Sequence, residues 1–258
     1  MRIAFRIVLI LILVGIVAGI VVVATSLDGI VKKGVETFGP QITKVSVNLE
    51  AVHIVLFTGS AKVTGLVVGN PEGYKTPQAI SAGLVEVGVN PFSILSDKIV
   101  IRTVHVISPE ISFEGGLSGN NLGKIMENVN ASAKTGAKPS NNGAAPAASQ
   151  PGKKIEVDDF LITGAKVHVR LTDMGGKEIT LPLPDIHLTD LGKDSDGLTP
   201  ADLTRAMLKA VTTATIKAVS ASATDLGKGV ENLGKDAAGG AVKSVDKIKK
   251  GLGGLLNQ

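Results

Sequence analysis

Four histidines are the side chains of this chain best suited to binding a metal or moving a proton, and they stand far apart. Each lies alone in a strand-like stretch, without a second ligand at metal-site spacing. They are His53, His105, His168 and His187. The chain has no cysteine, which excludes thiolate metal sites, cysteine nucleophiles and disulfides. The sequence therefore predicts no metal and no other cofactor.

Three other segments have the composition of a catalytic or binding motif but not its spacing. Asp158-Asp159 is a carboxylate pair, yet adjacent side chains of a strand point to opposite faces. Residues 194–197 (Asp-Ser-Asp-Gly) open like a calcium loop, but Arg205 occupies the bidentate position. Gly115–Lys124 is rich in Gly and Asn without phosphate-loop spacing. Since no nucleophile, base and orienting group form a set, we expect no enzymatic activity.

An uncharged run of twenty-one residues, Ile7–Leu27, determines where the rest of the chain lies. As a helix it would be about 31 Å long, which matches a hydrocarbon core of about 30 Å. Arg2 and Arg6 precede it and hold the N-terminus in the cytoplasm by the positive-inside rule. A signal peptide cleaved near Ala24 is the alternative, although its apolar region usually has only about 7–15 residues. The predicted anchor residues are Ile7, Leu13, Ile20 and Leu27.

From residue 42 the apolar residues recur with a period of two, which is typical of strands. The strands are predicted near 42–49, 52–57, 62–68, 79–89, 99–107, 111–113, 155–162, 167–171, 179–183 and 186–188. The break at Thr163-Gly164 predicts a hairpin between its two flanking strands. Pro182 and Pro184 limit the last two strands to an edge of the sheet.

The run Ile99–Ile107 is apolar on both faces, with Ile99 and Ile101 on one face and Val100, Val104 and Val106 on the other. A sheet that is covered on one side only does not need this pattern. Either helices cover both faces, or one face lines an apolar groove. The candidates for lining such a groove are Val85, Val87, Val89, Ile99, Ile101, Val104, Val106, Val167, Val169 and Leu171.

Helical spacing predicts three helices after the anchor. The first covers residues 28–39 and ends at Gly39-Pro40, and the second covers 120–129. The third begins at Thr199 as N-cap, with Pro200 in the first turn and Asp202 at the third position, and runs to about residue 222. The resulting units are 1–27 (anchor), 28–129 (first strand-rich half), 130–152 (low-complexity linker), 153–198 (second half) and 199–258 (helical tail).

The net charge of +4 resides entirely in the tail. Residues 199–258 hold nine Lys/Arg and five Asp/Glu, and the remainder holds eighteen of each. From residue 226 an apolar stripe adds to this basic surplus, which favours a helix on anionic lipid; a solvated coil is the alternative. The predicted membrane-surface residues are Lys243, Lys247, Lys249 and Lys250. Aromatic residues are only 3%, so we expect no nucleic-acid partner.

In their order along the chain, these features resemble the AsmA-like family of bacterial inner-membrane-anchored proteins. The matching segments, within about residues 1–222, are the uncharged run and the motifs VETFGP (35–40), VGNPEGY (68–74), SILSDKIVI (93–101), PEI (109–111), NNL (120–122) and LPLPDI (181–186). The resemblance implies an α+β fold, with an N-terminal transmembrane helix, a strongly curved, mainly antiparallel sheet that forms an open groove, and C-terminal helices.

The resemblance also implies a place and a function. The chain would be a single-pass protein of the inner membrane with its bulk in the periplasm. Like the similar bridge-like lipid-transfer proteins, it would bind or pass phospholipid and serve outer-membrane biogenesis, with a protein partner or as a homo-oligomer. A membrane-tethered structural or interaction module without lipid cargo is the main alternative, and an enzyme is the third. The first two differ in whether residues such as Ile99 and Ile101 face a cavity or the protein's own helices.

Overall fold

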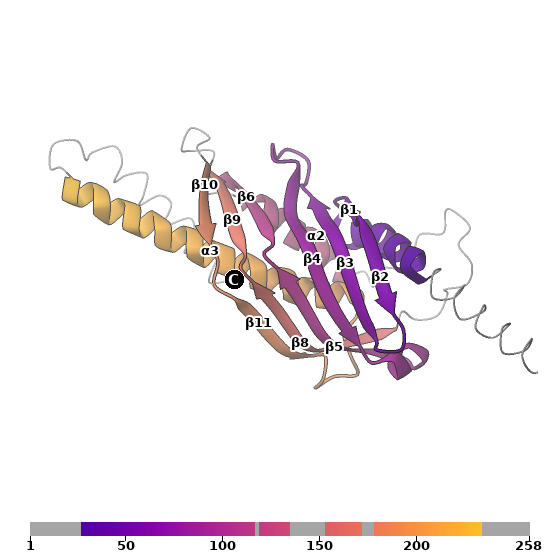
Figure 1. Ribbon diagram of the computed structural model, residues 1–258. Coiled ribbons are helices and arrows are strands. Elements are labelled where there is room, and N and C mark those ends of the chain that lie inside the picture. Colours follow the sequence, from indigo (N-terminus) through magenta and orange to yellow (C-terminus); the bar gives the residue numbers. More distant parts are fainter. Residues whose placement is uncertain (1–26, 117–118, 135–152, 172–177, 234–258) are drawn as a thin grey trace, which may run out of the picture.

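The computed structural model describes residues 27–116, 119–134, 153–171 and 178–233 (Figure 1). They form an α+β fold with one mixed, unclosed sheet, three α-helices and one short 3-10 helix. Within these residues, no helix is both long enough and apolar enough to cross a bilayer. The predicted anchor apart from Leu27, most of the predicted linker and the four lysines of the predicted membrane-surface tail lie outside the described residues.

The elements follow the predicted order of strands and helices. The strands are β1 (Val47–Asn48), β2 (Ala51–Val55), β3 (Ser60–Gly69), β4 (Gln78–Val89), β5 (Lys98–Ile107), β6 (Glu110–Gly116), β7 (Gly119–Asn120), β8 (Lys154–Thr163), β9 (Lys166–Leu171), β10 (Glu178–Pro182) and β11 (Ile186–Leu191). The helices are one over residues 27–43, the 3-10 helix η1 (Pro91–Leu95), α2 (Asn121–Lys134) and α3 (Pro200–Leu233).

The strand order is β10-β9-β6-β4-β5-β8-β11. β3 lies on the other side of β4, and β1 and β2 both pair with β3. Two pairings, β5 with β8 and β6 with β9, are parallel. All other pairings among the described strands are antiparallel. β10 and β11 each pair on one side only, which confirms that the proline-flanked strands lie at sheet edges.

Consecutive strands form three long strands that bend at the same level of the sheet. The bends lie at Ser108-Pro109 between β5 and β6, at Gly164-Ala165 between β8 and β9, and at residues 183–185 between β10 and β11. They are joined by hydrogen bonds, because the N–H of Ser108 donates to the carbonyl of Thr163 (2.8 Å) and the N–H of Leu183 donates to that of Ala165 (2.9 Å).

The prediction of a hairpin at Thr163-Gly164 is therefore wrong. β8 pairs with β5 and β11, whereas β9 pairs with β6 and β10. Gly164 has a φ of 64° and lies so close to Ser108 that a Cβ would be 2.9 Å from its Oγ. Glycine fits this left-handed bend as well as it would fit a hairpin turn, so the sequence alone does not distinguish the two.

One extra residue, Arg102, interrupts the alternation of β5. Gly88 pairs with Thr103 and Val89 with Ile101, so Arg102 forms a β-bulge. A single extra residue exchanges the two faces of a strand. Accordingly Ile101, Val104 and Val106 all contact the same buried cluster. Alternation along the sequence predicted that Ile101 and Val104 lie on opposite faces of β5. In the structure the bulge brings both side chains to the same core.

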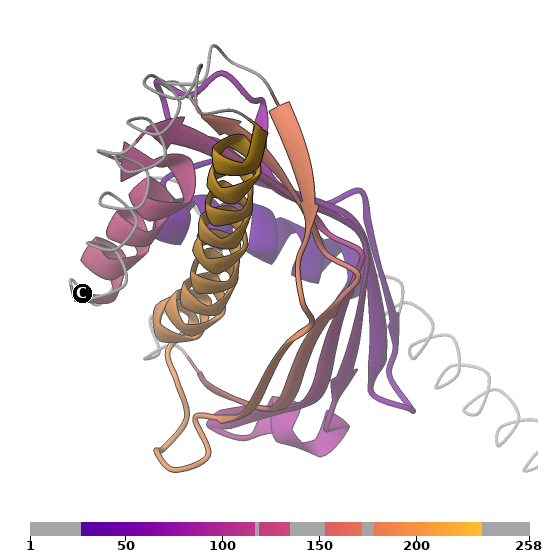
Figure 2. The same cartoon turned by 90° about the vertical axis from the view of Figure 1, so that its left-hand side faces the viewer.

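Helices lie on the concave side of the curved sheet (Figure 2). The core joins β6, β8 and β9 to α2 and α3, and its most deeply buried members include Ile111, Leu122, Ile125, Val129, Val157, Val167 and Val169. α3 begins as predicted: the N–H of Asp202 donates to Thr199 Oγ1 (3.1 Å), which in turn donates to the Asp202 carboxylate (2.7 Å). It continues to Leu233, beyond the predicted end near residue 222.

The helix over residues 27–43 passes through Gly39-Pro40, where the sequence predicted its end. The hydroxyl of Thr43 donates to the carbonyl of Gly39 (2.9 Å), and the N–H of Lys44 donates to that of Pro40 (2.9 Å). These bonds satisfy the last carbonyls of the helix, and Lys44 leaves it with a φ of 58°. The predicted strand over 42–49 is consequently reduced to β1.

The same helix covers the β2 edge of the sheet. Asp28 Oδ1 accepts from the N–H of Ile54 (2.9 Å), and Glu36 Oε1 accepts from that of Leu49 (3.0 Å). Unpaired edge groups invite pairing with other chains, so these carboxylates protect the edge. The contacts also place the start of the helix beside the end of β2.

A buried carboxylate holds the β3–β4 loop to the start of α2. Glu114 is 7% exposed and accepts from the N–H groups of Lys75 (2.7 Å) and Thr76 (2.7 Å) and from the Thr76 hydroxyl (2.8 Å). The N–H of Glu114 donates to Asn121 Oδ1 (2.9 Å), and Asn121 Nδ2 donates to Asn70 Oδ1 (2.8 Å). Two motifs of the resemblance, those around Asn70 and Asn121, thus meet in one polar network.

We predict that Glu114→Gln lowers the free energy of unfolding by about 1–3 kcal/mol at pH 7. Burial raises the pKa of Glu114, but the hydrogen bonds from Lys75 and Thr76 outweigh it and hold the pKa below 4.5. A lowered folded-state pKa contributes stability above pH 4.5 that is lost as pH falls through the folded value. Urea unfolding of the full chain in detergent should show the gap between wild type and variant closing in acid. Glu127→Gln at an exposed site is the control, and equal stabilities at pH 7 would contradict the prediction.

Candidate functional site

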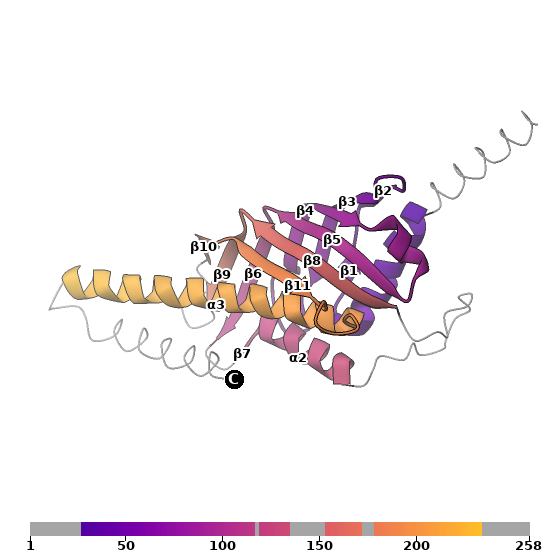
Figure 3. The ribbon, with the colours of Figure 1, turned by 90° about the horizontal axis from the view of Figure 1, so that it is seen from below.

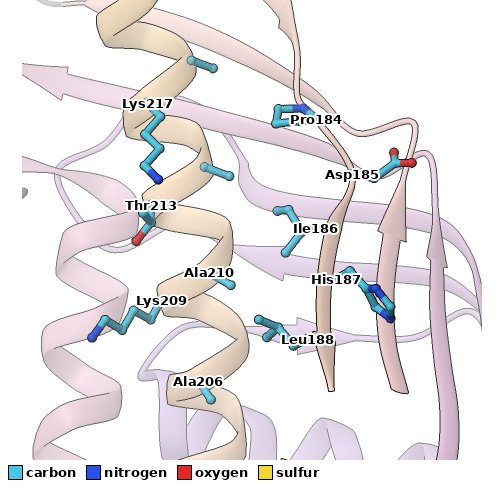
Figure 4. Close-up of a pocket in the computed structure, with 12 residues that line it drawn as sticks. Pro184, Asp185, Ile186, His187, Leu188, Ala206, Lys209, Ala210, Thr213 and Lys217 are labelled. Carbon is cyan, nitrogen blue, oxygen red and sulfur yellow. The ribbon is translucent and has the colours of Figure 1, made fainter. Parts of the chain in front are cut away.

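A groove of about 710 Å³ lies between β11 and α3 (Figure 4). This volume is within the range of about 300–1,000 Å³ that is typical of small-molecule sites. The β11 side consists of the consecutive residues 184–188. The α3 side consists of Ala206, Lys209, Ala210, Thr213, Ala214, Lys217 and Ala218.

The floor of the groove is apolar because α3 carries alanine at every fourth position from 206 to 218. Residues four apart lie on one face of a helix. Ala206 and Ala210 lie on the side of α3 that faces Ile186 and Leu188 (Figure 4). A methyl group fills little of the space between helix and strand, so the small side chains leave the groove open. Ile186 is buried and Leu188 is half-buried, which makes the floor continuous with the core.

The α3 rim of the groove is cationic. Lys209 and Lys217 are exposed on either side of Thr213, and within the described residues neither lysine forms an ion pair. The opposite rim carries Asp185, whose carboxylate accepts from the N–H of Gly164 (3.4 Å), and His187. Figure 4 shows both lysine side chains extending from the side of α3 that is away from β11, so the cations flank the apolar floor from the outer side of the helix. An apolar floor flanked by cations suits an amphiphile with an anionic head.

β11 also offers the groove an open strand edge. It pairs with β8 through residues such as Ile186 with Ile162 and Leu188 with Phe160, and no described strand pairs with its other side. The unpaired N–H and C=O groups of an edge can bind an added strand. The groove therefore combines apolar side chains, cationic groups and backbone donors and acceptors.

The residues predicted to line a lipid groove lie elsewhere in the sheet, and none of those described contacts this groove. Val85, Val167 and Val169 are buried, the latter two in the core under the helices. Half-buried positions are Val87, Val89, Ile99, Ile101, Val104 and Val106. The side chain of Leu171 lies outside the described residues.

The four histidines do not form a common site: three contact side chains near or on neighbouring strands, and His53 contacts the helix over residues 27–43. The ring of His187 contacts the Asp159 carboxylate on β8, and His105 Nε2 lies 2.8 Å from the hydroxyl of Thr163. His168 lies 3.4 Å from a Glu178 oxygen, and His53 lies 3.8 Å from Asp28. In the described part of the chain, no three His, Asp or Glu side chains form a group that could hold a metal ion.

Sequence reasoning missed the groove because neither of its walls carries a binding motif. Alanine at every fourth residue of a helix is ordinary helix composition, and the edge position of β11 was the one available signal. No protein-family model, no curated protein and no solved structure matches this chain.

Proposed function

We propose that this chain is a membrane-anchored periplasmic protein of envelope biogenesis that binds a phospholipid without catalysing a reaction. The observation that carries the proposal is the groove between β11 and α3, with its apolar floor and the unpaired Lys209 and Lys217. An acyl chain would lie along Ile186, Leu188 and the alanines of α3. The lipid phosphate would lie beside one of the two lysines, where charge and hydrogen bonding favour an anion.

The concave face of the sheet supplies a second apolar surface for the same cargo. Val87 and Val104 are cross-strand partners and therefore point to the same face, and both are half-buried. The sheet is six rows wide, because β1 and β2, β5 and β6, β8 and β9, and β10 and β11 each share a row and the two-residue β7 adds none. Six rows correspond to a width of about 30 Å. A single copy of this width suits local lipid handling at one membrane rather than transfer between two.

A membrane-tethered interaction module is the second candidate, and the free edge of β11 favours it. An extended segment of a partner protein could pair with β11 and place alternate side chains on the floor of the groove. In this case the groove would bind peptide backbone, and Lys209 and Lys217 would contribute only to the rim.

We predict that a phospholipid with a photoreactive acyl chain crosslinks to residues 184–188 and 206–218 of the full chain in nanodiscs. Ala214→Phe should reduce this crosslinking about tenfold because the ring fills the groove, whereas Ala221→Phe at an exposed position of α3 should leave it unchanged. Mass spectrometry of the crosslinked peptides makes the measurement. Crosslinking that is equal in both variants would exclude the groove as the lipid site.

The lysines allow a second measurement on the same samples. We predict that Lys209→Glu with Lys217→Glu lowers crosslinking to anionic phosphatidylglycerol more than to zwitterionic phosphatidylcholine, because the substitution repels the net negative head group. Lys75→Glu with Lys134→Glu, at two exposed positions that do not line the groove, is the charge-matched control. An equal loss of crosslinking to both lipids would show that the lysines do not distinguish head groups by their charge.

The topology is tested separately from the groove. A run without charge that follows Arg2 and Arg6 predicts one crossing with residues 28–258 exported. A reporter that is active only outside the cytoplasm should be active when fused after Gln258. Activity of a cytoplasm-specific reporter at the same place would contradict the predicted orientation.

A further inference from the structure

Four large apolar side chains gather, strongly exposed, at the end of the molecule where β2 turns into β3 and β4 leads into β5. Phe57 is 85% exposed, Phe92 87%, Leu95 92% and Ile94 42%. We call Phe57, Phe92, Ile94 and Leu95 the apolar tip. Single exposed apolar residues are ordinary on soluble proteins, but a group of this kind marks a surface that contacts a partner or a membrane.

The tip is held together by the backbone of its two loops. The N–H of Val89 donates to the carbonyl of Gly59 (2.6 Å), and a Cβ on Gly59 would lie 2.9 Å from Pro91 Cδ. Arg102, the bulge residue of β5, donates to the carbonyls of Thr58 (3.1 Å) and Val89 (2.9 Å).

Within η1, one face of the turn carries two of the exposed side chains. Asn90 caps η1, since its side chain accepts from the N–H of Phe92 (3.1 Å). Residues three apart in a 3-10 helix lie on the same side, so Phe92 and Leu95 point together. Since these hydrogen bonds fix η1 to the turn that contains Phe57, the apolar tip is an ordered surface of the protein.

The tip lies at the end of the molecule where the proposed anchor enters. Leu27 is the last residue of the uncharged run and the first of the described helix. In that first turn, Asp28 accepts from the N–H of Ile54 (2.9 Å), and Ile54 precedes Phe57 by three residues, which span at most about 10 Å. Figures 1 and 3 show η1 and the start of this helix at the same end of the sheet.

The charges around the tip suit a lipid surface. Arg102 and Lys153 are cationic, and the Lys153 ammonium contacts the carbonyl of Ile94. Asp97 is the exposed carboxylate beside η1, and the two cations bind carbonyls of the tip loops directly. Apolar side chains rimmed by basic groups are the composition of segments that enter the boundary between head groups and acyl chains by about 5–10 Å.

We infer that the apolar tip rests in the outer leaflet of the membrane that the uncharged run crosses, and fixes the orientation of the sheet on that membrane. The anchor gives one point of attachment, and the tip gives a second at the same end of the molecule. The body then stands with the β3–β4 loop, at the opposite end of the ten-residue β3, about 30 Å from the lipid. This orientation goes beyond the binding of a lipid in the groove and does not depend on it.

The absence of cysteine from the chain allows a direct test. The full chain is placed in vesicles of phosphatidylcholine and phosphatidylglycerol, with one environment-sensitive fluorophore on Leu95→Cys or, as control, on Glu72→Cys in the β3–β4 loop. Lipids with a nitroxide on the acyl chain should quench the label at 95 at least about threefold more than that at 72. Iodide in the water should show the reverse order.

A second variant tests whether the apolar side chains cause the contact. With the label on Asp97→Cys, the triple change Phe57→Ser, Phe92→Ser and Leu95→Ser should abolish quenching by lipid, and circular dichroism should stay unchanged because all three are exposed. Quenching that persists in this variant would overturn the inference. A label at 95 that iodide reaches as readily as the one at 72 would overturn it as well.

Two other outcomes identify a different cause. A label at 95 shielded from both lipid nitroxide and iodide would mean that protein, such as a second copy of this chain, covers the tip, and would overturn membrane contact. Protein that alkaline carbonate extracts from the vesicles would refute the proposed anchor and this inference together. A stable insertion with a water-exposed tip would refute the inference alone, and neither result alters the crosslinking test of the groove.

Discussion

The parallel pairing between the two strand-rich halves is the constraint on which this fold depends. β5 and β6 lie beside β8 and β9 over nearly their whole length. Antiparallel neighbours can be joined by a turn of two residues, but parallel neighbours need a crossover of a dozen or more. The stretch from β7 through α2 to residue 153 is that crossover, so its length follows from the pairing. The other long strands reach these four strands through shorter connections. The parallel pairs are therefore the contacts that join the two halves of the sheet.

The shared bend at Pro109 and Gly164 divides the sheet into two arms with different surroundings. On the arm of β6 and β9, Ile111 and Val167 are at most 1% exposed, because α2 and α3 pack against them. On the arm of β3, β4 and β5, cross-strand partners such as Val87 and Val104 stay half-exposed. The adjacent bends at Ser108-Pro109 and Gly164-Ala165 thus separate a closed core on one arm from a partly open apolar face on the other.

The sequence predicted the elements well where local chemistry determines them. The capping residues Thr199 and Asp202 predicted the start of α3, and apolar alternation predicted β4 and β8. The sequence-based prediction failed where the local conformation depends on residues that are distant in the sequence. Thr163-Gly164 bends a continuous strand because Ser108 lies beside it, and Arg102 reverses the faces of β5 because β4 lacks a matching residue. The groove was beyond sequence reasoning for the same reason, since its walls are an edge strand and a helix joined by a loop without any binding motif.

The composition that opens the groove also limits how firmly α3 is docked, and this links the occupancy of the groove to stability. Burying the methyl group of an alanine stabilises the fold by only about 0.8 kcal/mol, far less than burying a leucine side chain at the same place. On the buried face of α3, the hydroxyls of Thr212 and Thr215 have no hydrogen-bond partner within the described part of the protein, at a cost of about 1–3 kcal/mol each. A molecule that binds only when α3 lies against β11 stabilises that arrangement by mass action, by about 2.7 kcal/mol at a hundredfold excess over Kd. The position of α3 is therefore the feature of this fold that depends most directly on what fills the groove.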